Sequence, residues 1–444
     1  MANFNKNTQQ FGPHGHDKTI YEVPMIATKD GQVVTHENPF PVTVSASNTS
    51  TGSDAFGRTR ISQPLTLFDS SHRYADNDKW AEDTTGTASS SFNSDQGLMD
   101  LTVDTASGDE IIRETKRVMS YQPGKSLLIL TTFVFASAKE NLRQRVGYFN
   151  TENGIFLEQD DTTINIVKRS SISGSVVDTQ IEKGEWSYDS LDGTGPSGYT
   201  LDLTKAQIFW MDLEWLGVGS VRCGFVIDGK FVVAHVFNHA NDISSTYMTT
   251  ASLPLRQELT NTGITESVST AKQICASVVS EGGYQLAGQQ SSVNTPITSA
   301  KSLATAGTYY PVAAIRLKSA RNGAVVILSN LSLVGVGNGI NFHWKLVQGG
   351  TVTTASWTSG GTNSAVEYTL IGTAHSGGNT LAGGFFNSSN QSTPTITIGK
   401  DELFKFQLER DTFTGTSEPI VLLVSAATDA EECFGGLDWE EISR

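Results

Sequence analysis

Two apolar segments joined by a short turn constrain the fold of this chain more than any other feature of its sequence. Residues 221–227 and 231–237 are rich in Val, Phe and Ile, and Asp228–Gly229 stands between them. Asp-Gly in this position is a strong signal for a type I′ turn between antiparallel strands. The two segments are therefore predicted to form a β-hairpin, and residues 207–216 are predicted to form the strand before it.

Similar short apolar segments recur along the chain, without the 3.6-residue period of an amphipathic helix. Residues 126–135 are almost continuously apolar or Thr, which predicts a strand buried on both faces. Residues 145–149 and 154–158 are predicted to pair across a short turn. Residues 162–168 and 175–182 are predicted to do the same. Strands at this spacing predict an all-β fold with a β-sandwich or jelly-roll core.

The chain divides into parts by composition. Residues 284–310 are rich in Gln, Ser, Thr and Gly, which is typical of a linker. Predicted strands resume at residues 313–317, 324–333, 341–347, 365–370, 395–398, 403–408 and 419–424. We expect an extended N-terminal docking arm with its own linker, a jelly-roll-like β-sandwich, a second linker and a second, C-terminal β-sandwich unit. Their bounds are 1–53, 54–283, 284–310 and 311–444.

The N-terminal arm is polar except for two short stretches, residues 21–26 and 39–44. In the second stretch Phe40, Val42 and Val44 alternate with prolines and Thr, and each proline favours an extended residue before it. Neither stretch can bury enough surface to fold alone. We predict that the arm docks on a neighbour, with these three side chains at the contact, by adding a strand to a sheet edge.

Charge and cysteine content exclude several classes of protein. Lys plus Arg number 31 and Asp plus Glu 46, a net charge of −15, which disfavours binding to nucleic acid. No apolar run approaches the ~20 residues that span a bilayer, so we expect no membrane insertion. Cys223, Cys275 and Cys433 are odd in number and far apart, which predicts neither a disulfide framework nor a zinc site.

Two carboxylates lie on the strand predicted over residues 207–216. Alternation places Asp212 and Glu214 on one side, with Cα atoms ~6.7 Å apart at ~3.3 Å per residue. Glycoside hydrolases hold their two carboxyl groups ~5–9.5 Å apart, so this spacing is permissive. The flanking positions are apolar, however, and Arg222 on the next strand is a ready partner. We predict an ordinary sheet face with no catalytic residue, on which Trp210 is the candidate for ligand contact.

Signals for a metal or cofactor are weaker still. His235 and His239 stand four apart at the end of a predicted strand, too far separated for one ion, and His14 and His16 lie in the arm. Acidic loops could offer oxygen ligands to calcium, but none matches the twelve-residue EF-hand pattern. Phosphate-binding glycine motifs and a serine nucleophile elbow are missing from the sequence. We expect no metal and no cofactor.

Several motifs occur together in a fixed order. Residues 54–70, DAFGRTRISQPLTLFDS, resemble a signature of virion structural proteins in tailed phages, especially marine and cyanobacterial ones. Further segments are similar to the same family: YQPGKS at 121–126, DGTGPSG at 192–198, EWLGVG at 214–219, GFVIDG at 224–229, VSEGG at 279–283 and, more loosely, NSAVEY at 363–368. The resemblance implies a component of the virus particle, in the tail or in the capsid.

The signature also has a physical interpretation. Phe56–Gly57–Arg58 suits a tight turn that presents a guanidinium group, and Arg60 emerges on the same side two residues later. Arginine pairs with carboxylates through two parallel hydrogen bonds. We predict that Arg58 and Arg60 clamp neighbouring subunits or domains together.

Two interpretations of function follow. The first is a non-enzymatic structural component of a tailed-phage virion, assembled in the host cytoplasm as a homo-oligomer with other virion proteins. It would lie on the exterior, in the tail, baseplate or fibre, or would decorate the capsid. The second is a carbohydrate-binding or carbohydrate-cleaving jelly roll, in which Asp212, Glu214 and Trp210 meet a glycan of the host surface.

Overall fold

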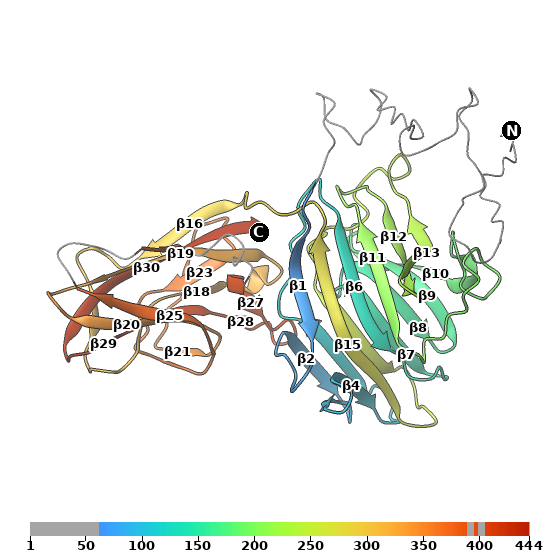
Figure 1. Cartoon of the computed structure of the whole chain (residues 1–444), viewed down its shortest axis with the longest axis horizontal. Helices are drawn as coiled ribbons and strands as arrows, with labels where there is room; N and C mark the ends of the chain where they lie inside the picture. Colours follow the sequence, from blue (N-terminus) through green and yellow to red (C-terminus); the bar gives the residue numbers. More distant parts are fainter. Residues whose placement is uncertain (1–61, 389–394, 398–404, 444) are drawn as a thin grey trace, which may run out of the picture. The chain divides into compact units, whose positions relative to one another are not determined.

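The computed structural model describes residues 62–388, 395–397 and 405–443, within the compact unit Ser62–Arg444. Strands dominate this part of the chain, and its helical residues form short 3₁₀ turns: η1 (Lys183–Glu185), η2 (Ser319–Arg321) and a turn at residues 405–406. The prediction of an all-β fold with a β-sandwich core is confirmed (Figure 1). In the described residues, no helix has the length and apolar character needed to span a membrane.

Two antiparallel sheets form the N-terminal sandwich. The first sheet has the order β13-β12-β11-β6-β15-β4-β3, and β1 pairs with the C-terminal part of β15. Its strands are β1 (Leu65–Ser71), β3 (Ser89–Asn93), β4 (Leu98–Val103), β6 (Leu127–Val134), β11 (Gln207–Leu213), β12 (Val221–Ile227), β13 (Lys230–Phe237) and β15 (Ser269–Ser280). The second sheet has the order β10-β9-β8-β7-β14-β5-β2. Its strands are β2 (Trp80–Thr85), β5 (Glu110–Thr115), β7 (Leu142–Phe149), β8 (Gly154–Asp160), β9 (Thr163–Ser170), β10 (Val177–Glu182) and β14 (Leu255–Asn261).

The inner faces of these sheets share one hydrophobic core. Because side chains alternate along a strand, every second residue points inward. Ile129 of β6 and Phe209 of β11 come from the first sheet, and Tyr148 of β7 and Leu157 of β8 come from the second. All four are fully buried.

The predicted hairpins are confirmed by the strand pairing. β12 and β13 are antiparallel, with Ile227 opposite Lys230. Between them Asp228 and Gly229 have φ values of 51° and 74°, the positive pair that a type I′ turn requires. β7 pairs with β8 and β8 with β9, and β9 in turn pairs with β10, so the predicted pairs over residues 145–158 and 162–182 are present.

The C-terminal strands form a second sandwich. Its five-stranded sheet has the order β16-β30-β19-β26, with β17 also on β30, and its six-stranded sheet has the order β22-β23-β18-β29-β20-β25. The strands are β16 (Gln289–Asn294), β17 (Lys301–Leu303), β18 (Tyr310–Leu317), β19 (Val325–Gly335), β20 (Asn341–Gln348), β22 (Thr358–Ser359), β23 (Val366–Thr369), β25 (Asn379–Asn387), β26 (Thr395–Thr397), β29 (Ile420–Ala426) and β30 (Glu431–Ser443). Two small pairs complete it: β21 (Thr351–Thr353) with β24 (Ala374–Ser376), and β27 (Glu409–Arg410) with β28 (Ser417–Glu418). Trp439, Leu328 and Leu422 lie in its core.

Three predictions about individual segments were wrong. The segment 284–310, predicted to be a linker, contains β16 and β17, because the thirteen-residue β30 offers both of them backbone partners. The described part of the predicted strand 403–408 is a 3₁₀ turn at residues 405–406 followed by an isolated bridge from Gln407 to Ile327. The strand predicted to be buried on both faces, β6, has one fully buried face and one half-buried face.

Candidate interaction surface

The outer face of the first sheet is apolar over neighbouring strands. We call this surface the apolar face. It consists of Leu128 and Leu130 on β6, Ile208 and Trp210 on β11, Val226 on β12, Phe231, Val233 and Val236 on β13, and Val279 on β15. Most of these side chains are half-buried, and Phe231 is 54% exposed. In Figure 1 this side of the sheet faces the viewer, and no other described sheet lies in front of it.

Trp210 lies near the centre of the apolar face, but its ring is not available for stacking on a ligand. Trp210 lies directly opposite Gly224 on β12, where no side chain occupies the space beside the indole. The indole packs edge-to-face against the ring of Phe231, with 5.2 Å between the ring centroids. Only 3% of Trp210 is exposed. Its indole Nε1 is buried without a hydrogen-bond partner. The exposed aromatic ring of this surface is therefore that of Phe231.

The two candidate carboxylates do not act as a pair. Asp212 lies directly opposite Arg222 on β12 and forms an ion pair with it, as expected if the acid belongs to an ordinary sheet face. β11 ends at Leu213, one residue earlier than the spacing argument requires. Glu214 then opens an exposed turn that is closed by the Gly219 N–H donating to the Trp215 carbonyl at 2.7 Å. The alternation that would align the two acids thus stops between them.

Two histidines near this sheet are fixed by hydrogen bonds to neighbouring groups. His239 Nδ1 lies 2.8 Å from the Gly219 carbonyl, so it donates, and Nε2 accepts from Lys168 Nζ at 3.2 Å. His235 Nδ1 accepts from the Ser187 N–H at 3.2 Å. Burial lowers the pKa of both imidazoles below its ordinary value. In the described residues no group of three His, Cys, Asp or Glu side chains could hold a metal ion.

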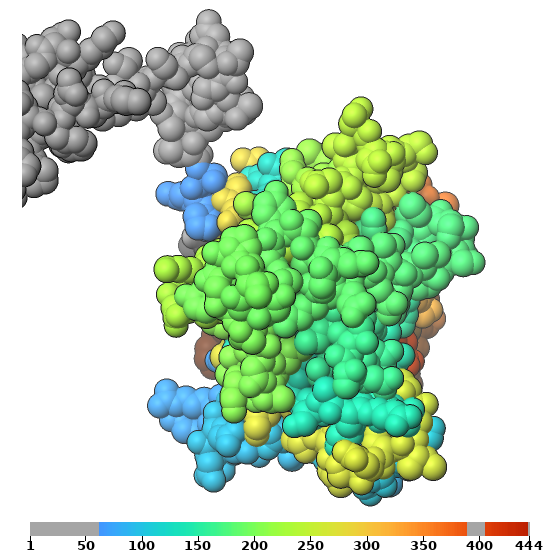
Figure 2. Space-filling model, turned by 90° about the vertical axis from the view of Figure 1, so that its right-hand side faces the viewer, coloured from blue at the N-terminus to red at the C-terminus, as the bar shows by residue number. Residues whose placement is uncertain are grey.

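The acidic loop after η1 is closed by its own backbone. Asp189 accepts the N–H groups of Leu191 and Ser197, each at 2.8 Å. Asp192 accepts both the N–H and the hydroxyl of Thr194, which lower the pKa of its carboxyl to about 2. These carboxylate oxygens therefore stabilise the turns of their own loop by accepting its N–H and O–H groups. Figure 2 shows the surface at this end of the sandwich, formed mainly by the strands and loops of residues 142–237.

A shallow hollow of about 280 Å³ lies at the β12–β13 turn and shares Val226 with the apolar face. Polar groups of Tyr199, Gln207 and Asp228 line it, together with Val226 and Ile227. The Tyr199 hydroxyl donates to Asp228 Oδ2 at 3.0 Å, which fixes one side of the hollow. Sequence reasoning missed this hollow, because its residues come from a loop and two strand ends whose proximity only the fold determines.

The outer face of the second sheet carries a different surface, which we call the charged lattice. Arg145, Arg256, Glu114, Glu158 and Glu258 form it. Arg256 donates through Nε to Glu258 at 2.6 Å and through Nη1 to Glu114 at 2.9 Å. Burial alone would raise the pKa of Glu258, but the neighbouring guanidinium groups outweigh it and hold that pKa below its ordinary value. Charged residues alternate with other residues along two of these strands, but this pattern did not lead to a prediction of the charged lattice.

The predicted contact residues of the arm and the signature lie outside the described residues. These are Phe40, Val42, Val44, Arg58 and Arg60. The described chain begins beside the first sheet, where Ser62 Oγ donates to the Glu281 carbonyl at 2.9 Å.

Comparisons with known proteins give weak likenesses only. No protein-family model matches the chain, and no curated protein matches it significantly. Among solved structures, the carbohydrate recognition domain of Emp47p is similar over 52% of this chain and 99% of its own, at 11% identity and a TM-score of 0.31. The CBM2 module of the evolved Dit of Lactobacillus casei BL23 phage J-1 matches 51% of this chain and all of its own, at 6% identity and a TM-score of 0.33. The Bacteroides ovatus xyloglucan PUL protein GH43B matches 57% of this chain and 46% of its own, at 11% identity and a TM-score of 0.30. These values carry no argument about function.

Proposed function

We propose that this chain is a non-enzymatic structural component of a tailed-phage virion that assembles through subunit–subunit contacts. It would lie on the exterior of the particle, in the tail, baseplate or fibre, or as a decoration of the capsid. The observation that carries the proposal is the apolar face, because a contiguous apolar surface that stays partly accessible to water, with Phe231 exposed, is typical of a protein contact. The ordered motifs that resemble virion proteins support the same role.

The state of the candidate acids also favours a structural role. The carboxylate of Asp212 is engaged in an ion pair with Arg222 on the neighbouring strand. Glu214 lies beyond the end of β11, in a turn. The chain therefore uses Asp212 as one half of a cross-strand ion pair.

The experiment is a double substitution, Asp212→Asn with Glu214→Gln, in the virus that encodes the chain. We expect particles of unchanged yield, with the protein still bound, and unchanged adsorption to host cells. Loss of adsorption with normal assembly would instead support a glycan site at these acids. Imaging of particles that carry a dense tag after Arg444 would then distinguish tail from capsid, and a protein absent from purified particles would refute the proposal.

A second candidate function is binding of a host-surface glycan, and the hollow beside Tyr199 favours it. Its size suits one sugar ring, and Tyr199, Gln207 and Asp228 supply hydrogen-bond donors and acceptors next to apolar side chains. Saturation-transfer NMR with neutral mono- and disaccharides tests this role. A signal that disappears in Asp228→Asn and persists in Asp212→Asn would establish it, and no signal with any sugar would remove it.

A further inference from the structure

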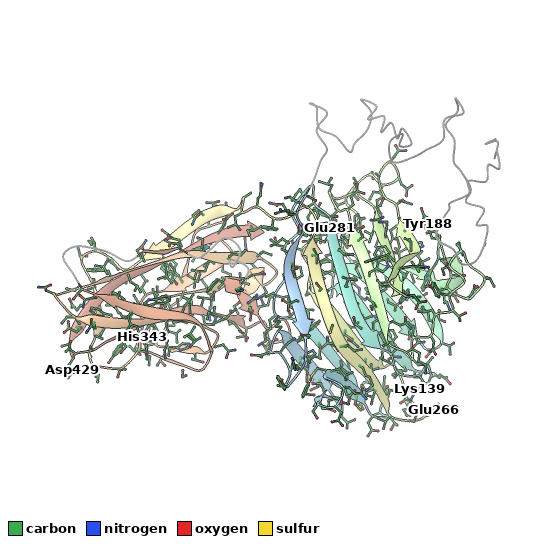
Figure 3. All side chains as sticks on the ribbon, viewed as in Figure 1. Lys139, Tyr188, Glu266, Glu281, His343 and Asp429 are labelled. Atoms are coloured by element: carbon green, nitrogen blue, oxygen red, sulfur yellow. The ribbon has the colours of Figure 1, made fainter. Side chains whose placement is uncertain are left out.

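The outer side of the six-stranded sheet in the C-terminal sandwich carries a row of three aromatic rings. Phe385 on β25 lies directly opposite His343 on β20, with 4.4 Å between the ring centroids. Tyr309, the residue before β18, adds the third ring, 5.7 Å from that of His343. The sequence neighbours Phe342 and Phe386 lie in the core, so the row faces outward. The exposed fraction of Phe385 is 81%, and the other two rings are half-buried. Figure 3 shows His343 on this sandwich.

Contacts within the row fix the orientation of the imidazole. The Tyr309 hydroxyl donates to His343 Nδ1 at 2.5 Å, so the neutral imidazole carries its proton on Nε2. Lys345 Nζ lies 4.3 Å from the centroid of the Tyr309 ring, which places an ammonium group beside the imidazole. Gly383 lies next to Nε2, because a Cβ built on this glycine would be 4.0 Å from that atom. Nε2 is therefore a donor that the glycine leaves uncovered.

The charge on this side of the sheet is positive, although the chain as a whole has a net charge of −15. Strand pairing gives the positions that point outward on the three strands β20, β25 and β29. They are Asn341, His343, Lys345, Val347, Thr380, Gly383, Phe385, Asn387, Val421, Leu423 and Ser425. None of these described positions is a carboxylate. A surface that offers an ammonium group and an N–H donor without an acid beside them selects a ligand with negatively charged oxygens.

An exposed ring next to these donors fits a sugar that carries a carboxylate. The face of Phe385 offers apolar surface to the C–H groups of a sugar ring, and a few placed polar groups then fix the orientation of the ligand. We propose that Phe385, His343 and Lys345 bind a hexuronic acid residue of a polysaccharide. The sugar ring lies on Phe385, and its carboxylate accepts hydrogen bonds from His343 Nε2 and Lys345 Nζ. This site is separate from the hollow beside Tyr199, and it does not depend on the proposed virion role.

Calorimetric titration of the full-length chain with trigalacturonic acid tests the site. The same trisaccharide with methyl-esterified carboxyl groups is the neutral counterpart. We expect the acid to bind ~10-fold more tightly than the ester, and Lys345→Gln to remove that difference, because one charge-assisted hydrogen bond is lost. The affinity for the acid should fall as the salt concentration rises. Phe385→Ala should weaken the binding of both ligands ~5-fold, because both stack on the same ring.

Tyr188→Ala is the matched control for the ring. Tyr188 is 61% exposed and lies on the N-terminal sandwich, as Figure 3 shows, so its loss should leave both affinities unchanged. Circular dichroism verifies the fold of each variant. Three results would overturn the proposal: equal affinity for acid and ester, no binding of the acid at millimolar concentration, or equal losses in Phe385→Ala and Tyr188→Ala. Binding that disappears in Asp228→Asn would belong to the hollow beside Tyr199 and would also count against this site.

Discussion

The outer faces of the two N-terminal sheets differ, although their inner faces share one core. The second sheet covers the rings of Phe149 and Phe156 with the guanidinium groups of Arg145, Arg169 and Arg256. Carboxylates from adjacent strands then neutralise those arginines. The first sheet has mostly aliphatic side chains in the equivalent position, and the described residues of that face form two cross-strand ion pairs, Asp212–Arg222 and Lys272–Asp100. The second sheet is covered by its own charged side chains together with Arg410 and Thr412, which both bind Glu114, whereas the first sheet leaves apolar side chains partly accessible, and we propose that surface as a subunit contact.

The largest expected effect is on the charged lattice. Arg256→Ala removes one guanidinium group from the buried carboxylates of Glu114 and Glu258, which keep Arg410 and Arg145 as partners, so we take the lower end of the about 3–5 kcal/mol that breaking a buried pair costs, about 3 kcal/mol. We expect the free energy of unfolding to fall by that amount in urea titrations. A loss below about 1 kcal/mol would show that the lattice is solvated, and the contrast between the two faces would then disappear.

A glycine beneath the apolar face gives the next effect. A Cβ at Gly224 would lie 1.9 Å from the Val232 carbonyl, at the irregularity in the β12–β13 pairing. Gly224→Ala should therefore force the strands apart and destabilise the chain by about 1–3 kcal/mol. Gly229→Ala is a control with open space around it, although its φ of 74° adds some strain. Equal stability of wild type and Gly224→Ala would contradict the described packing of β12 on β13.

The two sheets should lose stability over different pH ranges on acidification. His72, His235 and His239 flank the first sheet, and burial is the main cause that lowers the pKa of each. The unfolded chain then binds more protons below pH ~6.5, so stability falls as the pH decreases from about 7 to about 5. The slope is at most about 1.4 kcal/mol per pH unit for each histidine. Glu258 has a lowered pKa, so its contribution is lost only below about pH 4.5.

Urea titrations between pH 7.5 and 5.5 measure the histidine effect. His239→Gln should flatten the profile, because one of the titrating groups is removed. A wild-type profile that is flat in this range would show that the three imidazoles are protonated as easily in the folded chain as in the unfolded one.

The smallest effect is expected at the ion pair of the apolar face. The Arg222 side chain is 57% exposed, and exposed pairs contribute about 0–1 kcal/mol. Arg222→Ala should therefore change the free energy of unfolding by less than about 1 kcal/mol in the same assay. If Arg222→Ala cost as much as Arg256→Ala, the exposed pair of the first sheet would be as strong as the buried pairs of the second, and the proposed difference between the two outer faces would be wrong.

Local signals in the sequence were enough to predict the strands that are apolar or joined by a distinctive turn. Asp228–Gly229 specifies its hairpin by backbone geometry alone, and β6 is recognisable from its continuous apolar residues. β15 and β30 were missed, because Ser, Lys, Gln and Glu interrupt them. Glu441 on β30 is buried, and its carboxylate accepts hydrogen bonds from the Ser364 hydroxyl and the Ala365 N–H, which lie 77 and 76 residues away.

The candidate site was predictable only in part, for the same reason. Cross-strand neighbours such as Asp212 and Arg222 follow from a hairpin register, and their pairing was expected. The contact of Arg256 with Glu114 joins residues 142 positions apart, which no local pattern predicts. The outer side of β6 was expected to be buried, and the uncovered surface found there is what identifies the apolar face.

Sedimentation velocity of the full-length chain at micromolar concentration tests the central claim most directly. If the apolar face is an assembly surface, the wild-type chain and Val177→Asp, a control at an exposed position of β10 on the other sheet, sediment as oligomers, and Phe231→Asp sediments as a monomer. A wild-type chain that remains monomeric up to tens of micromolar, or a Phe231→Asp variant that still forms oligomers, would contradict the account.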